Sequence, residues 1–590
     1  SIRVGGQDME IPNAIKTKSV EEWFEPAAGR VNWDGLGAEI KAMDFSDEKN
    51  AVYSFQFNGP EDKKREFMNC VECFCLGEEA QQETQEETEQ DYLQDASDFQ
   101  QVGNAEMAFQ KYMVAARDYG HPEAQFEVAR CYQNGVGVAK NAENAVVWYK
   151  KAAEQGNAEA QCALGECYYQ ARGVEKDDKE ARRWYEAAAT QGNVTAQYMT
   201  GRLYAELSYN EAAVKWYTKA AEQECPEAQY ELGVCYETGD GVGKDKAKAV
   251  ELYRKAAEQG YAEAQNKLGV CYSNGTGVAR DDAQAVGWYR KAAENGNVKA
   301  LYNLGEHYYC GLDENKAEAV KWYKKAAEQN HAWAQYMLGE CYYYGRGLDE
   351  NEAEAVKWFK KAAEQGNADA QNNLGVCYHN GEGVEKNSAK AVEWYRKSAE
   401  NGNASAQYNL GLCYEYGDGV TKDLGRAAEW YRKSAEQGYA VAQYKLGRCY
   451  DYGDGIEHDC QKAVEWYRKS VEQGCAMAQC DLGNCYKHGR GVEKNLEKAV
   501  EWYRKSAEQG YDRGQFALAG CYEYGEGVPQ DKEKALQWYK KAADQGFGGA
   551  EWAIKNMQSN GIGPALAFGA ALAVEGVLEK LERLGEIFKG

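Results

Sequence analysis

The sequence predicts a mostly α-helical protein, in which about twelve helix pairs stack into a solenoid that follows a small α+β domain. Three observations lead to this prediction. A frame of alanine, leucine, glycine and aromatic residues returns about every 36 residues between residues 105 and 557. Residues 1–76 lack this frame. The chain has 62 glycines and 7 prolines, which suits helices that end at glycine caps. A fixed period of this length is typical of repeat architectures.

Residues 1–76 are predicted to form the small α+β domain. The segment Ile2–Ile11 is predicted to form two short strands around a Gly-Gly turn. Ser19 is predicted to cap a short helix. Trp33–Met43 is predicted to form a second helix. In Ala51–Asn58 the aromatic residues alternate, which indicates a strand, and a further helix is expected after Pro60.

Residues 77–104 are predicted to be an acidic linker or helix between this domain and the repeats. The stretch Glu78–Asp98 is acidic, of low complexity and almost without apolar residues. Such a composition favours a solvated helix or a flexible linker. The alternative is a docking strip for a basic partner.

Residues 105–557 carry the repeats. An aromatic pair, with one Leu-Tyr variant, marks the second helix of each unit. The steps between these pairs are 36 residues, except for one of 32 and one of 34. The pairs begin at Trp148, Trp184, Trp216, Leu252, Trp288, Trp322, Trp358, Trp394, Trp430, Trp466, Trp502 and Trp538. We call the first helix of a unit helix A and the second helix B.

The unit Ala370–Gly402 shows how the pattern predicts this pair. Helix A has an apolar stripe with a helical period. Gly375 leaves no side chain at a point where another helix is expected to approach closely. Gly381 is placed to end helix A in a left-handed conformation, and Asn387 to cap helix B.

The repeated motif A-x-A-Q-x-x-L-G-x-x-Y-x-x-G-x-G-V…A-x-x-W-Y-x-K-A-A-x-Q-G resembles the Sel1-like repeat family, relatives of the tetratricopeptide repeats. Twelve units match. The third unit lacks the G-x-G-V loop, and the second has Ala171-Arg-Gly173 in its place. The resemblance implies right-handed superhelical stacking and a role as a protein-binding scaffold or adaptor. Family members serve in adaptor complexes, in membrane-protein quality control and in bacterial interactions with hosts.

Residues 558–590 differ from the repeats in composition. Ile562–Val574 is apolar apart from its glycines and proline, and Glu575–Lys589 has the pattern of an amphipathic helix. The apolar run is shorter than the roughly 20 residues that a membrane-spanning helix needs. We expect this tail to cap the solenoid, because terminal repeats need a cover. A partner-binding or oligomerising helix and a membrane-surface anchor are the alternatives.

Charge and cysteine content narrow the functional classes. The chain has 94 acidic against 69 basic residues, a formal charge of −25. A nucleic acid partner is therefore not expected, whereas a protein with basic segments is. Ten of the 19 cysteines share one position of helix A, and layers about 8–10 Å apart are too far for them to pair. These ten are Cys131, Cys167, Cys235, Cys271, Cys341, Cys377, Cys413, Cys449, Cys485 and Cys521. We expect the cysteines to be reduced, and the sequence given has no signal-peptide pattern. Both observations favour a cytoplasmic protein.

No catalytic, cofactor-binding or metal-binding residue is predicted. The G-x-G loops follow helices, whereas a nucleotide fingerprint follows a strand. No pair among the six histidines has the spacing of a zinc site. The cluster Cys70-x-x-Cys73-x-Cys75 is interpreted as buried and inert, with a reactive or metal-binding cluster as the alternative. Two alternative functions stay open. The chain could be a regulator or minor enzyme whose active part is residues 1–76, or an adaptor anchored to a membrane by its tail.

The candidate partner-binding residues lie at helix A positions that the repeat leaves variable. Offsets of three and seven residues place them on one face of the helix. If helix A lines the concave side, this face forms a groove for an extended peptide or a partner helix, with tyrosines as anchors. The alternative is that these positions are simply solvated. The candidates are Lys267, Val270, Asn274, Asn303, Glu306, Met337, Glu340, Tyr344, Asn373, Val376, Asn380, Asn409, Leu412, Tyr416, Lys445, Arg448 and Tyr452.

Overall fold

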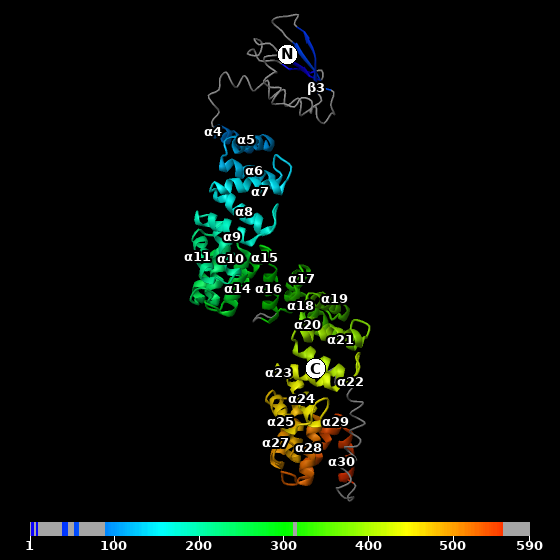
Figure 1. Cartoon of the computed structure of the whole chain (residues 1–590). Coiled ribbons are helices and arrows are strands. Elements are labelled where there is room, and N and C mark those ends of the chain that lie inside the picture. The colour runs from blue at the N-terminus through cyan, green and yellow to red at the C-terminus, as the bar shows by residue number, and fades with distance from the viewer. Residues whose placement is uncertain are drawn as a thin grey trace. The chain divides into compact units, whose positions relative to one another are not determined.

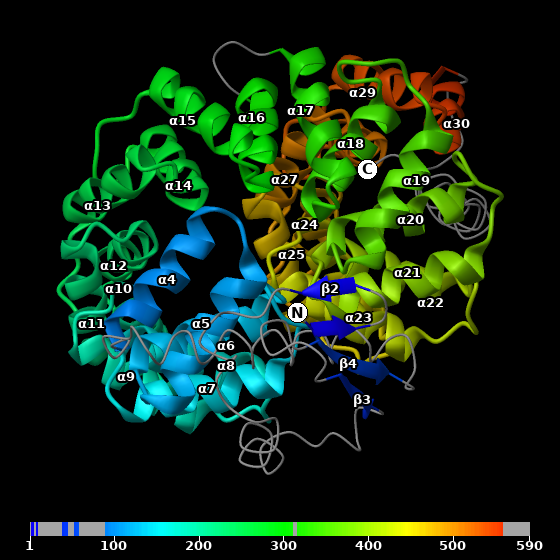
Figure 2. The same ribbon diagram turned by 90° about the horizontal axis from the view of Figure 1, so that it is seen from above.

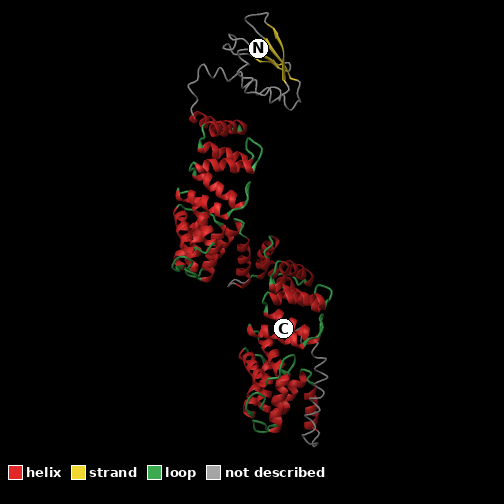
Figure 3. Ribbon diagram, in the orientation of Figure 1, coloured by secondary structure: helices red, strands yellow, loops and turns green. Residues whose placement is uncertain are grey.

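The computed structural model of the chain describes residues 2–4, 7–9, 38–44, 52–57, 89–310 and 315–558. The chain divides into two units, Ser1–Cys225 and Pro226–Gly590. The first unit contains a four-stranded sheet and helices, and the second contains helices (Figures 1 and 3).

The sheet has the strand order β2-β1-β4-β3. Strands β1 (Ile2–Val4) and β2 (Gln7–Met9) form an antiparallel pair, which confirms the predicted hairpin. Strand β4 (Val52–Phe57) confirms the predicted strand at this place and runs parallel to β1.

One prediction for this region is wrong. Residues 38–43 lie in strand β3 (Ala38–Asp44), not in the helix expected over residues 33–43. Alanine, glutamate, lysine and methionine favour helices locally. Here the antiparallel pairing of β3 with β4 decides the conformation. The other predicted helices of this domain, the cysteines at 70, 73 and 75, and the tail from residue 559 onwards lie outside the described residues. What the sequence indicates for them stays a prediction.

The helices of the first unit begin inside the segment that we expected to be an acidic linker or helix. Ala96 in α4 is fully buried, and Tyr92, Leu93 and Phe99 pack on the same cluster as α5. The described part of this segment is therefore a packed helix, although its charge suggested a solvated one. The helices are α4 (Glu89–Gln101), α5 (Ala105–Asp118), α6 (Pro122–Asn134), α7 (Ala142–Glu154), α8 (Ala158–Gln170), α9 (Asp178–Thr190), α10 (Val194–Glu206) and α11 (Asn210–Glu222).

The second unit has the same alternation of helix A and helix B and ends with the single helix α30. Its helices are α12 (Pro226–Thr238), α13 (Lys246–Glu258), α14 (Ala262–Asn274), α15 (Asp282–Glu294), α16 (Val298–Cys310), α17 (Lys316–Glu328), α18 (Ala332–Tyr344), α19 (Glu352–Glu364), α20 (Ala368–Asn380), α21 (Ser388–Glu400), α22 (Ala404–Tyr416), α23 (Leu424–Glu436), α24 (Ala440–Tyr452), α25 (Cys460–Glu472), α26 (Ala476–His488), α27 (Leu496–Glu508), α28 (Asp512–Tyr524), α29 (Lys532–Asp544) and α30 (Gly548–Gln558). The predicted helical solenoid is confirmed.

The helix ends follow the capping residues that the sequence placed there. Gly381 ends α20 with φ +85°, in the left-handed region. The side chain of Asn387 caps α21 by accepting a hydrogen bond of 2.9 Å from the backbone N–H of Lys390. The third unit, which lacks the G-x-G-V loop, has a short connection between α10 and α11.

The cysteines of the repeat position are packing residues, as predicted. Nine of the ten are buried, and the tenth, Cys235, is half-buried. No cysteine in the described part of the chain forms a disulfide. Burial raises the pKa of the Cys377 thiol to about 12, so the thiol stays protonated at neutral pH.

A ladder of glutamine side chains joins successive units. The A-Q glutamine of helix A is buried, as Gln371 is at 4% exposure. Its side-chain amide donates a hydrogen bond to the backbone carbonyl of the residue eight positions earlier, in the preceding helix B. In the case of Gln371 this acceptor is Ala363, at 3.0 Å. Its oxygen accepts from the amide at the end of the next helix B, 30 residues later, as Gln371 does from Asn401 at 3.1 Å. These two bonds fix the spacing of the stacked helices.

Within the described residues, no helix is both long enough and apolar enough to cross a membrane.

Candidate protein-interaction face

The predicted site residues occupy six consecutive A helices of the second unit. They lie on α14, α16, α18, α20, α22 and α24, and we call this surface the A-face. In Figure 2, α14 lies on the inner side of the bend that it forms with α13 and α15. Each of these six helices carries two or three of the candidates.

Most of these residues are half-buried and do not project freely. Leu412 is buried at 6% exposure, whereas Tyr344 and Tyr452 are 51% and 54% exposed. Asn274 is also exposed. The A-face thus has a half-buried floor and a small number of projecting side chains.

The asparagines of the floor connect neighbouring A helices. The Nδ2 atom of Asn373 donates to Glu340 Oε1 of the preceding A helix at 2.5 Å. Asn303 Nδ2 donates to Asn266 Oδ1 at 2.8 Å across the same kind of junction. These side chains hold the stack together, a role that the repeat pattern alone does not indicate.

The acidic residues of the floor are held in the same way. Tyr323 of helix B donates its hydroxyl hydrogen to Glu306 at 2.6 Å. Burial raises the pKa of the Glu340 carboxyl, and this effect exceeds the opposing effects of Arg346 and Asn373.

Glu415 shows the opposite balance. Burial tends to raise the pKa of this carboxyl, but Lys445 at 3.3 Å and the hydroxyl of Tyr431 outweigh burial and lower it. Glu415 is therefore a charged acceptor inside the floor, and Lys445 is its ion-pair partner.

The projecting side chains are tyrosines at the last position of helix A. Tyr344, Tyr452 and Tyr524 are 51%, 54% and 38% exposed. Tyr344 lies 4.5 Å from the Arg346 guanidinium, measured to the ring centroid, and Tyr452 lies 5.3 Å from that of Arg448. An aromatic ring beside a cation is typical of interface anchors.

Tyr524 was missing from the predicted set. It ends α28 at the same repeat position as Tyr344, Tyr416 and Tyr452, and we therefore include it in the A-face. The signal was present in the sequence, because extending the register of the last helix A position to the final unit would have found it.

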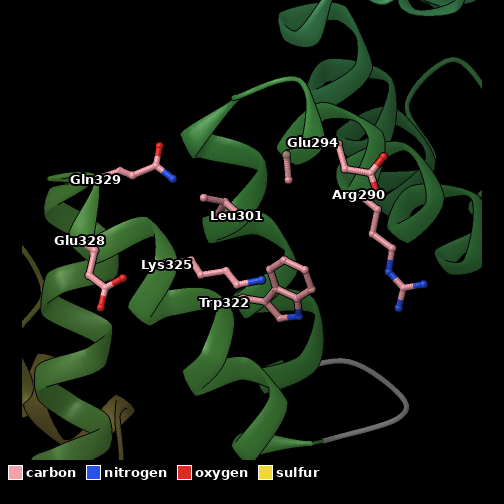
Figure 4. A pocket seen from close by; sticks show the side chains of 8 residues that line it. Arg290, Glu294, Leu301, Trp322, Lys325, Glu328 and Gln329 are labelled. Atoms are coloured by element: carbon pink, nitrogen blue, oxygen red, sulfur yellow. The ribbon is translucent and has the colours of Figure 1, made fainter.

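A pocket of about 470 Å³ opens where the glutamine ladder is interrupted. In the sixth unit Leu301 stands where the other units have the buried glutamine. Leu301, Trp322 and Gln329 line the pocket, with Arg290 and Glu294 on the opposite wall (Figure 4). Leu301 thus lines the pocket from the position that the buried glutamine takes in the other units.

Comparison with known proteins gives a consistent result. A family model described as Sel1 repeat matches residues 122–157, 158–193, 194–225, 226–261, 262–297, 298–331, 334–367, 368–403, 404–439, 440–475, 476–511 and 512–547. The chain is similar to a protective antigen of uropathogenic Escherichia coli that displays an SLR fold, with 36% identity, a TM-score of 0.58, and coverage of 82% of this chain and 97% of that chain. It is also similar to a Sel1 repeat protein from Oxalobacter formigenes, with 32% identity, a TM-score of 0.42, and coverage of 52% of this chain and 90% of that chain. No curated protein matches the chain.

Proposed function

The chain belongs to the Sel1 repeat family, and from this premise we propose that it is a non-catalytic scaffold that holds a partner protein on the A-face. Sel1 repeat proteins generally bind protein partners. A solenoid offers an extended binding surface because each unit presents the same face of the same helix.

The observation that supports this proposal is the row of exposed tyrosines. Tyr344, Tyr452 and Tyr524 expose large amphipathic rings from rigid helix ends. Tyr344 contacts the ring of Tyr343 with the ring centroids 4.8 Å apart, and about half of its surface stays exposed to a partner. Tyrosine contributes contact area at low entropic cost, because its side chain has few rotatable bonds.

The partner that suits this face is an extended peptide or a helix with basic residues. The formal charge of −25 favours association with a basic segment. Glu306 of the floor is half-buried and accepts a hydrogen bond from Tyr323. A carboxylate of this kind can also accept hydrogen bonds from lysine or arginine side chains of a partner.

Affinity capture followed by mass spectrometry tests the proposal, with the whole chain as bait. The informative variant is the triple substitution Tyr344→Ala, Tyr452→Ala and Tyr524→Ala, because these rings contribute little to the core. The matched control is Tyr209→Ala, which removes a tyrosine that is 61% exposed in the loop before α11.

We expect the triple variant to lose a partner that the wild type and the control both retain. Retention of every partner by a folded triple variant would refute the assignment of the A-face. Charge reversal at Glu340 or Lys445 is a less suitable test, because both side chains hold neighbouring A helices together.

A further inference from the structure

Three side chains of metal-binding type meet where α24 is followed by α25. Asp451 lies in the last turn of α24, His458 in the loop, and Cys460 at the first position of α25. One ligand atom from each lies within 4.8 Å of the other two. The Nε2 atom of His458 lies 3.3 Å from the Sγ atom of Cys460.

Two of these residues depart from the pattern of the adjacent units. The position of His458 is taken by Lys422 in the preceding unit and by Lys494 in the following one. The position of Cys460 is taken by Leu424 and Leu496. The fold therefore does not require histidine or cysteine here, and both changes occur in the same unit.

Asp451 provides an independent observation. It is 4% exposed. Its Oδ2 atom forms an ion pair with the guanidinium of Arg490 at 3.3 Å and accepts a hydrogen bond from the Tyr467 hydroxyl at 3.4 Å. Its Oδ1 atom is buried and has no hydrogen-bond partner. A buried carboxylate oxygen without a partner is unfavourable unless a cation or a donor compensates it.

We propose that Asp451, His458 and Cys460 bind Zn²⁺ through one oxygen, one nitrogen and one sulfur atom. Zinc takes thiolate, imidazole and carboxylate ligands in tetrahedral sites, whereas Mg²⁺ and Ca²⁺ prefer oxygen alone. Bond lengths of about 2.3 Å to sulfur and about 2.0 Å to nitrogen place these two ligand atoms about 3.5 Å apart in a tetrahedron. The distance from His458 to Cys460 is close to this value.

The surroundings suit such a site. Arg490 and Tyr467 hold the Oδ2 atom and so orient the carboxylate, as outer-shell partners of metal ligands do. Three protein ligands leave a fourth position for water or for a side chain of a partner. Zinc would tie the loop at His458 to the ends of α24 and α25, next to Tyr452 of the A-face.

Thiol protection measured on the full-length, reduced and EDTA-treated protein tests this proposal at residue level. The protein is alkylated with iodoacetamide in the presence and absence of Zn²⁺, and peptide mass spectrometry reports each cysteine. We expect Zn²⁺ to slow the modification of Cys460 at least tenfold, and that of the exposed Cys310 by less than twofold. Equal rates at Cys460 with and without Zn²⁺ would overturn the proposal.

Variants taken from the neighbouring units separate metal binding from folding. His458→Lys introduces a residue that the adjacent units tolerate at this position, and it is expected to abolish the protection of Cys460. In a titration with Co²⁺, the near-ultraviolet sulfur-to-cobalt absorption should be lost in Cys460→Leu and retained in the control Cys310→Ser. Protection that persists in His458→Lys, or absorption that persists in Cys460→Leu, would contradict the site.

Discussion

The ring of Tyr395 lies directly over the backbone of Gly375: a Cβ atom at residue 375 would lie 2.6 Å from the Tyr395 Cδ1 and Cε1 atoms. Tyr395 is itself buried at 4% exposure and cannot move aside easily. The substitution Gly375→Ala should therefore lower the free energy of unfolding by about 1–3 kcal/mol, because overpacking displaces the ring or helix B. Thermal unfolding and hydrogen exchange of α20 and α21 measure this loss.

A glycine in a helix B without a close neighbour provides the control. Gly287 lies inside α15, and a Cβ atom there would meet nothing within 4 Å. Gly287→Ala should raise the free energy of unfolding by about 0.5–1 kcal/mol, since alanine favours the helix. A destabilised Gly287→Ala, or a Gly375→Ala as stable as the wild type, would contradict this explanation of the L-G motif.

Removal of one ladder glutamine should loosen the junction between two units. Gln371→Leu removes the donor to Ala363 and the acceptor for Asn401, and we expect it to cost about 1 kcal/mol. Hydrogen exchange should increase in α20 and α21. The control Asn401→Gln keeps the ladder, since Gln365 and Gln437 occupy this position in the adjacent units. Equal exchange in both variants would show that the ladder does not stabilise the stack.

The stability of the protein should fall in alkali. Burial raises the pKa of the Cys377 thiol to about 12, whereas an unfolded cysteine titrates near about 8.5. The folded state thus holds its proton more tightly, and this contribution is complete below the pKa of the unfolded chain. It is lost as the pH rises from about 9 towards 12.

Denaturant unfolding at a series of pH values measures this dependence. The variant Cys377→Ala removes the thiol, so its stability should fall less steeply in this range, although it starts lower because a buried side chain is lost. A slope identical to that of the wild type would show that this thiol does not contribute.

The sequence predicted the repeat and the role of several positions within it, because each of these roles depends on residues close by in the chain. Gly381 and Asn387 are capping residues, and Gly375 marks a close approach, so their roles follow from residue type and spacing. The same helical offsets predicted that Tyr344 and Tyr452 lie on one face. Strand β3 was missed, because its pairing with β4 overrides local preferences that favour a helix.

The contacts between units could not be predicted from one unit alone. Asn373 was proposed for partner binding, yet its amide reaches Glu340 in the preceding helix A. The proposed zinc site escaped detection for a related reason. Asp451 is separated from His458 by a loop, and only the fold brings it to the His458–Cys460 pair.

Site-specific photocrosslinking tests the central claim, that the A-face holds a partner protein, most directly. A photoreactive phenylalanine derivative replaces Tyr344, Tyr452, Tyr524 or the control Tyr209 in the full-length chain in its native cells. We predict that the three A-face positions cross-link to a common protein and that position 209 does not. No cross-link from any of the three, or the same proteins cross-linked from position 209, would contradict the claim.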